Sequence, residues 1–159
     1  LRTDDNNFVA CLAEDGGAYG LALLDVSTGD FYATSADRES AIADELGRFG
    51  PAEAIVGPDA PIDPFDPECM VTPYDQSVFD LDAARDVVAS YFGAPENLLA
   101  TDVEIQACGA LLDYAEYTRG AEGDDDGQRG RLDYLNHLTR YDPREYMLLD
   151  AVALESLEL

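Results

Sequence analysis

Three strand-like runs separated by short turns make up the first 36 residues, and this pattern limits the fold more than any other feature. The first run, "NFVACLAE", is followed by a turn with two glycines, and the second ends at "STGD". Glycine in such turns permits the positive φ that a tight hairpin requires. Successive strands joined in this way pair antiparallel. The pattern therefore predicts an antiparallel three-strand meander over residues 7–14, 18–26 and 31–35.

The next 60 residues alternate between helix and strand patterns. A helix over about 38–49 carries apolar residues on one face, and Asp37 stands where a helix cap is expected. Short strands are predicted at 53–57 and near 69–74, and a second helix over about 81–92. This order predicts an α/β fold of the ribonuclease H-like kind, in which a mixed sheet combines the meander with parallel strands and is flanked by helices.

From about residue 100 the sequence becomes helical. "VEIQACGALLDYAEYTRG" places apolar residues on one stripe, and the polar tract 120–130 separates it from a final segment that still has a helix pattern where the sequence stops. We therefore predict two units, 1–100 and 101–159. The second should pack its apolar faces on the first unit or on sequence outside this chain, and we expect the chain to be a piece of a longer protein.

Acidic residues dominate the charge. The chain holds 34 Asp and Glu against 9 basic residues, all of them Arg, for a formal net charge of −25. The acids are spread along the chain, whereas a protein that binds basic partners would gather them in one block. Because 47% of the residues are hydrophobic, the acids must coat a folded surface. We predict a halophilic cytoplasmic protein, without a membrane-spanning segment and without a phosphate-binding face.

The three cysteines do not form a metal or disulfide pattern. Cys11, Cys69 and Cys108 are odd in number, far apart in sequence and without CxxC spacing. We predict free thiols in a reducing compartment.

The turn at 25–30, "DVSTGD", admits two enzymatic interpretations and one structural one. It has the outline of a phosphate-binding hairpin in actin-like ATPases, but the chain has no second Gly-rich loop to complete such a site. A ribonuclease H-like nuclease would need three or four carboxylates around two metal ions about 4 Å apart. The neighbouring strands offer only Glu14 and Glu53. We favour a hairpin corner in which Asp25 accepts the backbone amides of Thr28 or Gly29, and keep a metal-dependent nuclease or resolvase as the alternative.

Three further segments admit a functional and a plainer interpretation. Residues 122–133 resemble a calcium-binding loop, but the pattern is broken at its first and last ligands, which favours a solvated acidic loop. His137 is the sole histidine and should lie on a helix surface or be partly buried. "YDPREYMLLD" indicates a turn, a strand-like run and a helix capped by Asp150. No Walker A or nucleophile-elbow motif occurs.

Three stretches together resemble the MutS family of DNA mismatch repair proteins, in the type found in halophilic archaea. "YGLALLDVSTGDFYAT" is similar to a hairpin of the family's connector domain. "ACGALLDYAEYTRG" is similar to the helix that leads into the core domain, and "REYMLLDAVALESLEL" to the beginning of that core. The resemblance covers about residues 7–159 in order. It implies that 1–100 is a ribonuclease H-like connector, and that 101–159 is the linking helix and the beginning of the helical core.

The resemblance also implies a function and partners. The family reads mismatches through a Phe-x-Glu motif and hydrolyses ATP through a Walker A loop, and neither motif occurs here. The chain is therefore expected to be a non-catalytic connector with no cofactor of its own, which transmits ATP-driven change between those two ends. ATP, Mg²⁺, DNA binding and a homodimeric state are expected of the full-length parent. A MutL-type partner would dock on the connector, with the helix at 81–92 as a candidate surface; Asp86 and Val87 stand there in place of glutamines that some family members carry. An interaction module unrelated to repair is the remaining alternative.

Overall fold

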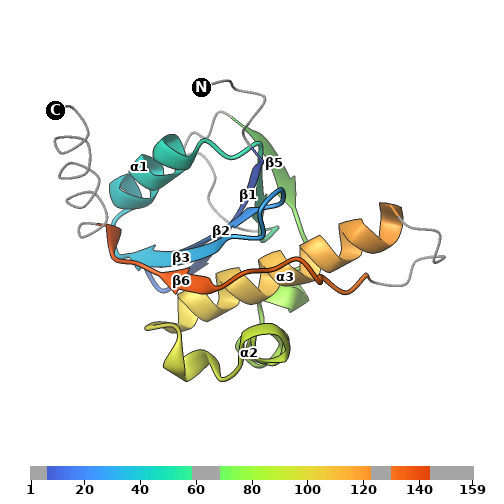
Figure 1. The fold of residues 1–159 in the computed structure, drawn as a ribbon. Coiled ribbons are helices and arrows are strands. Elements are labelled where there is room, and N and C mark those ends of the chain that lie inside the picture. Colours follow the sequence, from blue (N-terminus) through green and yellow to red (C-terminus); the bar gives the residue numbers. More distant parts are fainter. Residues whose placement is uncertain (1–6, 59–68, 123–129, 144–159) are drawn as a thin grey trace, which may run out of the picture.

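The structure is a computed structural model, and it describes residues 7–58, 69–122 and 130–143. The described residues form one sheet with helices on both of its faces (Figure 1). The strands are β1 Phe8–Asp15, β2 Ala18–Asp25, β3 Phe31–Ala36, β4 Glu53–Val56, β5 Met70–Pro73 and β6 Leu138–Arg140. The helices are α1 Glu39–Phe49, α2 Leu81–Phe92 and α3 Asp102–Glu122, with 3₁₀ turns η3 Gln76–Phe79 and η4 Pro95–Asn97.

The sheet joins an antiparallel meander to parallel strands. Its strand order is β5-β4-β1-β2-β3-β6. Strands β1, β2 and β3 pair antiparallel, whereas β4 is parallel to β1, β5 to β4, and β6 to β3. The predicted mixed α/β sheet with its three-strand meander is therefore confirmed. Strand β6 was not predicted, because three residues are too few to show an alternating pattern.

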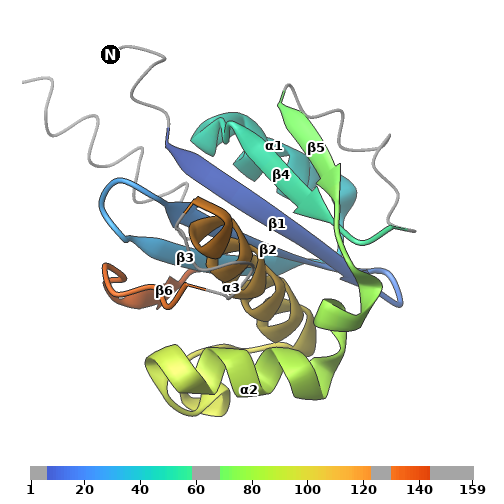
Figure 2. The same ribbon diagram turned by 90° about the vertical axis from the view of Figure 1, so that its right-hand side faces the viewer.

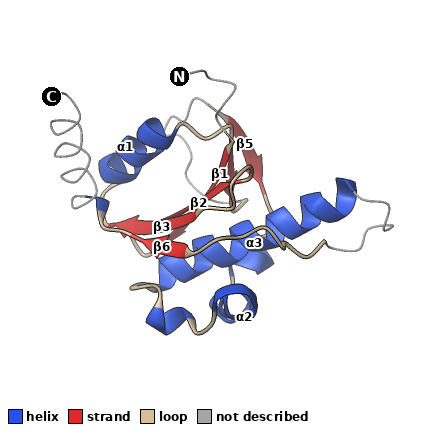
Figure 3. Ribbon diagram, viewed as in Figure 1, coloured by secondary structure: helices blue, strands red, loops and turns tan. Residues whose placement is uncertain are grey.

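The two faces of the sheet carry separate apolar clusters. Alternate residues of a strand point to opposite faces. In β1, Ala10 and Leu12 pack with Ile42 and Leu46 of α1 on one face, whereas Cys11 packs on the other. Helices α3 and α2 cover that second face, with α3 lying directly across the strands (Figures 1 and 2). Figure 3 shows the resulting layers of helix, sheet and helices.

Local sequence explains where the first two helices begin and end. In α1, Gly50 adopts the left-handed conformation and donates its amide to the Leu46 carbonyl. The predicted cap by Asp37 is wrong: Arg38 takes the N-cap position, and its side chain makes no capping hydrogen bond. Helix α2 has the predicted bounds, because Asp80 caps its first turn by accepting from the Ala83 amide, and Gly93 follows its last residue.

Helix α3 packs against the strands of the meander and against α2. Two glycines allow this close packing. A Cβ atom added at Gly20 of β2 would collide with the Val103 carbonyl, and one added at Gly109 of α3 would collide with Ala84 of α2. Within the described residues, the apolar face of α3 is thus buried on the first unit, as expected. The division of the chain at residue 100 stays a prediction.

Several remaining predictions concern the termini, the loops and the thiols. Cys11 and Cys108 are buried and Cys69 is partly buried, and all three are free, as predicted. In the parts of the chain that the structure describes, no helix has the length and apolar character needed to cross a membrane. The strand-like "YMLL", the cap at Asp150 and most of the calcium-like loop lie outside the described residues.

Candidate functional site

Asp25 organises the hairpin turn between β2 and β3. Its Oδ1 accepts the Ser27 amide at 2.9 Å, the Ser27 hydroxyl at 2.6 Å and the Thr28 amide at 3.3 Å. Partial burial raises the pKa of Asp25, but the hydrogen bonds from Ser27 and Thr28 together outweigh it and lower that pKa below its usual value. The predicted turn cap is therefore confirmed, with Ser27 and Thr28 as donors.

The same turn is fastened to the segment that leads into β6. Asn136 donates its side-chain amide to the Thr28 carbonyl at 2.8 Å and to Asp30 Oδ1 at 3.1 Å. Its backbone amide donates to the Gly29 carbonyl at 2.8 Å. Gly29 has φ 86°, and a Cβ atom there would collide with the Tyr134 carbonyl. The hairpin corner thus serves as a surface on which a distant segment packs.

The acids considered for a nuclease site have separate structural partners. Glu53 Oε2 accepts from Thr72 Oγ1 at 2.6 Å and from the Tyr114 hydroxyl at 2.8 Å. Glu14 Oε2 accepts the Gly17 amide at 3.2 Å. Among the residues that the structure describes, no group of three or more His, Cys, Asp or Glu side chains is placed to hold a metal ion.

Glu53 in turn perturbs the tyrosine beside it. Burial, the hydrogen bond to Glu53 and the negative charge of Glu53 raise the pKa of Tyr114 from its usual value of 10.0 to about 12. Tyr114 also packs edge-on against Tyr74, with ring centroids 5.2 Å apart. These contacts tie β4 and β5 to α3.

A cavity of about 740 Å³ opens beside this group, between α3 and the adjoining ends of β1 and β2. Its wall contains charges of both signs. Arg119 donates to Asp133 Oδ1 at 3.2 Å, and its guanidinium carbon lies 5.8 Å from the centre of the Tyr134 ring. The other polar and apolar lining residues include Val9, Val26, Ser27, Glu53, Leu111, Tyr114 and Leu132.

The candidate docking residues on α2 lie in different environments. Asp86 is exposed, whereas Val87 is partly buried and packs against the apolar cluster under α2. Between α2 and η4, Arg85 forms an ion pair with Glu96. Of the two predicted positions, Asp86 therefore has the side chain more available to a partner.

His137 is exposed and lies in the irregular segment before β6. Our interpretation of it as a helix-surface or partly buried residue is therefore wrong. It lines a shallow cavity of about 420 Å³ with Tyr91, Phe92 and Leu98.

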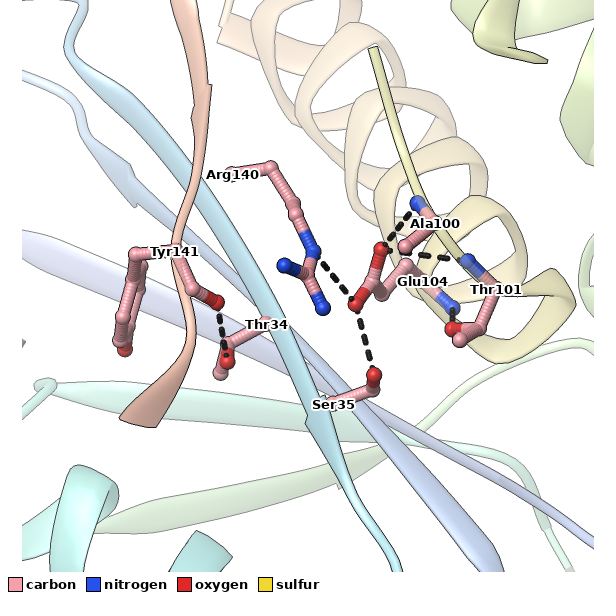
Figure 4. A network of polar contacts seen from close by, with 7 residues as sticks. All are labelled: Thr34, Ser35, Ala100, Thr101, Glu104, Arg140 and Tyr141. Carbon is pink, nitrogen blue, oxygen red and sulfur yellow. Dashed lines mark hydrogen bonds and ion pairs between the residues drawn. The ribbon is translucent and has the colours of Figure 1, made fainter. Parts of the chain in front are cut away.

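A polar network surrounds Glu104, whose side chain is fully buried (Figure 4). Its Oε2 accepts from Ser35 Oγ at 2.6 Å and from Arg140 Nε at 3.1 Å. Its Oε1 accepts the amides of Ala100 at 2.7 Å and Thr101 at 3.3 Å. The network thus joins α3 to β3 and to β6.

A second buried carboxylate lies on the opposite face of the sheet. Glu45 of α1 is 1% exposed, forms an ion pair with Arg48 and accepts from the Tyr141 hydroxyl at 2.7 Å. The backbone of Tyr141 is also held, because its amide donates to the Ala33 carbonyl at 3.0 Å and its carbonyl accepts from Thr34 Oγ1 at 2.7 Å.

Sequence reasoning missed both networks, although one has a local signal. "TDVE", residues 101–104, is a capping box: Thr101 Oγ1 accepts the Glu104 amide at 3.3 Å, and Glu104 accepts the Thr101 amide in return. Tyr141 and Glu45 are 96 residues apart in the sequence, so no local pattern predicts their contact.

Comparison with known proteins extends these observations. The sequence profile of MutS domain II matches residues 7–133. The chain is 66% identical over its full length to "DNA mismatch repair protein MutS" from Natronomonas pharaonis, and 64% identical over 98% of its length to "DNA mismatch repair protein MutS 2" from Haloarcula marismortui. A "DNA mismatch repair protein MutS 2" from Halobacterium salinarum is 56% identical over 98% of the chain. The chain spans 18% of the length of each of these relatives.

The match to the domain profile and the identity to these relatives agree with the resemblance found in the sequence. The relatives come from halophilic archaea, which agrees with the net charge of −25. The chain therefore belongs to the MutS family of DNA mismatch repair proteins, in its halophilic archaeal type, and contains the family's domain II.

Proposed function

We propose that this domain is a non-catalytic connector. It transmits an ATP-driven change between the mismatch-binding and ATPase parts of the full-length parent, and it offers a docking face to a MutL-type partner. The observation that carries the proposal is the way in which the buried carboxylates of α1 and α3 fasten the segment at 138–141 to the rest of the domain. Contacts of this kind are expected in a domain that moves as a rigid unit.

The strand order supports a ribonuclease H-like fold for this connector. Three antiparallel strands in chain order, followed by two strands added in parallel beside the first, correspond to the arrangement expected from the sequence. Helices on both faces complete that arrangement. A shared fold does not imply a shared reaction, since function depends on the site.

The carboxylates considered for a nuclease site each accept hydrogen bonds from their own neighbours, and this supports a non-catalytic role. A two-metal nuclease needs carboxylates that converge on the ions. Here Asp25 accepts from its own turn, Glu53 from Thr72 and Tyr114, and Glu14 from the adjacent hairpin.

Incubation with labelled DNA and with an RNA–DNA hybrid tests this point directly. The chain and its full-length parent should leave both substrates intact in Mg²⁺ at multimolar KCl. Mg²⁺-dependent cleavage that disappears in Asp25→Ala would contradict the proposal and support the nuclease alternative.

Exposure of Asp86 supports the outer face of α2 as the docking surface. Asp86→Arg should weaken binding of a MutL-type protein to the full-length parent about tenfold or more, because an exposed charge of the wrong sign opposes a complementary surface. Asp44→Arg on α1 makes the same charge change at another exposed position, and it should leave binding unchanged. Binding measured by calorimetry that responds equally to both variants would place the surface elsewhere.

The remaining properties concern the parent as a whole. We propose a cytoplasmic homodimer that uses ATP and Mg²⁺ and reaches DNA through its other domains. Membership in a DNA mismatch repair family supports this.

A further inference from the structure

Arg140 and Tyr141 fasten the chain to both layers of the domain. Their side chains point away from each other (Figure 4), as expected for consecutive residues of extended chain. Arg140 reaches Glu104 of α3 on one face of the sheet, whereas Tyr141 reaches Glu45 of α1 on the other. Two adjacent residues thereby connect helices that do not share a face.

Backbone pairing alone would hold this segment weakly. Strand β6 is at the edge of the sheet and contributes three residue pairs to β3, from Phe31–Leu138 to Ala33–Arg140. A short edge strand of this kind can separate from its neighbour without disturbing the rest of the sheet. The side-chain contacts of Arg140 and Tyr141 add to this pairing and to the contacts that Asn136 makes just before the strand.

The two acceptors are carboxylates that water does not reach. Glu104 is 0% exposed and Glu45 is 1% exposed. Removing a charge from water is costly unless donors replace the lost hydration. Four donors surround Glu104, and the Arg140 guanidinium is the one that carries a full positive charge. Release of the segment would thus cost more than the loss of exposed contacts.

The Tyr141 ring strengthens the second attachment. It is 8% exposed and lies 6.2 Å from the Phe49 ring between centroids. The guanidinium of Arg48, which also pairs with Glu45, lies 5.9 Å from the Tyr141 centroid. The hydroxyl, the ring and the backbone of Tyr141 are therefore all held by the domain.

We propose that Arg140 and Tyr141 form a two-sided clamp that makes β6 part of the same cooperative unit as α1, the sheet and α3. A displacement of the chain at residues 138–141 then moves both layers together instead of separating β6 from the edge. The coupling role of this clamp rests on the proposed connector function, but its cooperativity does not.

Two substitutions weaken the clamp while leaving each buried carboxylate with hydrogen-bond donors. Arg140→Gln leaves Glu104 with Ser35 and two backbone amides. Tyr141→Phe keeps the ring and leaves Glu45 paired with Arg48. Asp133→Asn is the matched control for the first variant because it breaks the exposed pair of Arg119, and Tyr19→Phe is the control for the second because it removes the exposed contact to Glu39.

Hydrogen exchange in the full-length parent at multimolar KCl and low urea tests the clamp. In the wild type, the amides of 138–141 should exchange with the same urea dependence as those of β3. Each clamp variant should speed exchange at 138–141 and at β3 by the same factor, about tenfold or more, because the lost contact lowers the free energy of the single opening that exposes both segments; the control variants should change neither. If Arg140→Gln does not fold, Tyr141→Phe decides the question, since it removes a single hydroxyl.

Two results would overturn the clamp. One is wild-type exchange at 138–141 that is fast and independent of urea, and the other is unchanged exchange at 138–141 in Tyr141→Phe.

A separate comparison of the wild type with and without ATP tests the proposed function. Absence of any ATP-dependent exchange in residues 7–143 would contradict the connector role, while the urea experiment would still decide whether the clamp exists.

Discussion

Individual acidic side chains in this domain differ in what they contact, although each counts equally toward the net charge. Asp44 and Asp86 are exposed and contribute charge to the surface. Asp25 holds a turn, and the lowered pKa of Asp25 reflects the donors of Ser27 and Thr28. Glu45 and Glu104 are buried and hold a distant segment. The first two roles could be predicted from the local sequence, whereas the third depends on contacts between residues far apart in the chain.

Tyr114 gives a prediction at the residue scale. Burial and Glu53 raise the pKa of Tyr114 from 10.0 to about 12, so the folded state holds this proton more tightly than the unfolded state does. The resulting stability is fully present below pH 10 and is lost as pH rises toward 12. Tyr114→Phe should flatten the fall in stability over that interval, measured by urea unfolding at several pH values. An unchanged fall would show that Tyr114 does not cause it.

Most helices and strands could be predicted from local sequence patterns, whereas the contacts between them could not. The meander, α1, α2 and the buried strand β4 follow from alternation, helical periodicity and glycine at the ends of elements. Strand β6 was missed because its position depends on Asn136 and Tyr141, which contact residues about 100 positions away, and on Arg140, which contacts Glu104, 36 positions away. The docking residues were placed through the family resemblance, and only the exposure of Asp86 could be added from the structure.

Gly109 tests the packing of α3 against α2. A Cβ atom at this position would collide with Ala84, so Gly109→Ala should lower the free energy of unfolding by about 2 kcal/mol despite the better helix propensity of alanine. Gly47→Ala in α1 is the matched control, because no atom lies within 4 Å of the new Cβ. It should raise stability by about 0.5–1 kcal/mol. Similar effects in both variants, measured by urea unfolding, would show that close helix packing is not the cause.

Charge is the property of the whole molecule that makes its stability depend on salt. With 34 acids and 9 arginines, repulsion between carboxylates opposes the folded state. Raising KCl from about 0.1 M to about 1 M shortens the screening length from about 10 Å to about 3 Å, which suppresses that repulsion. The midpoint of thermal unfolding, followed by circular dichroism, should therefore rise over this interval. A midpoint that falls or stays constant would show that repulsion is not what limits stability.

In the molecule as a whole, the attachment of residues 138–141 to both faces of the sheet is the physical basis of the connector proposal. One sheet carries α1 on one face and α2 with α3 on the other, and residues 138–141 are fastened to both layers. In the proposed connector role, such a body would pass a displacement from one side of the domain to the other without local unfolding. The surface acids are not needed for this behaviour; their charge and hydration keep the molecules apart from one another at high salt.

The most direct test is the ratio of the dissociation constants of the full-length parent for a mismatched duplex with and without ATP, measured by fluorescence anisotropy at multimolar KCl. Combining Arg140→Gln with Tyr141→Phe should move this ratio toward one while binding without ATP stays unchanged. Combining Asp133→Asn with Tyr19→Phe should keep the wild-type ratio. If the combined clamp variant retains the full ATP-dependent ratio, the clamp does not couple ATP to DNA binding and the connector proposal is wrong.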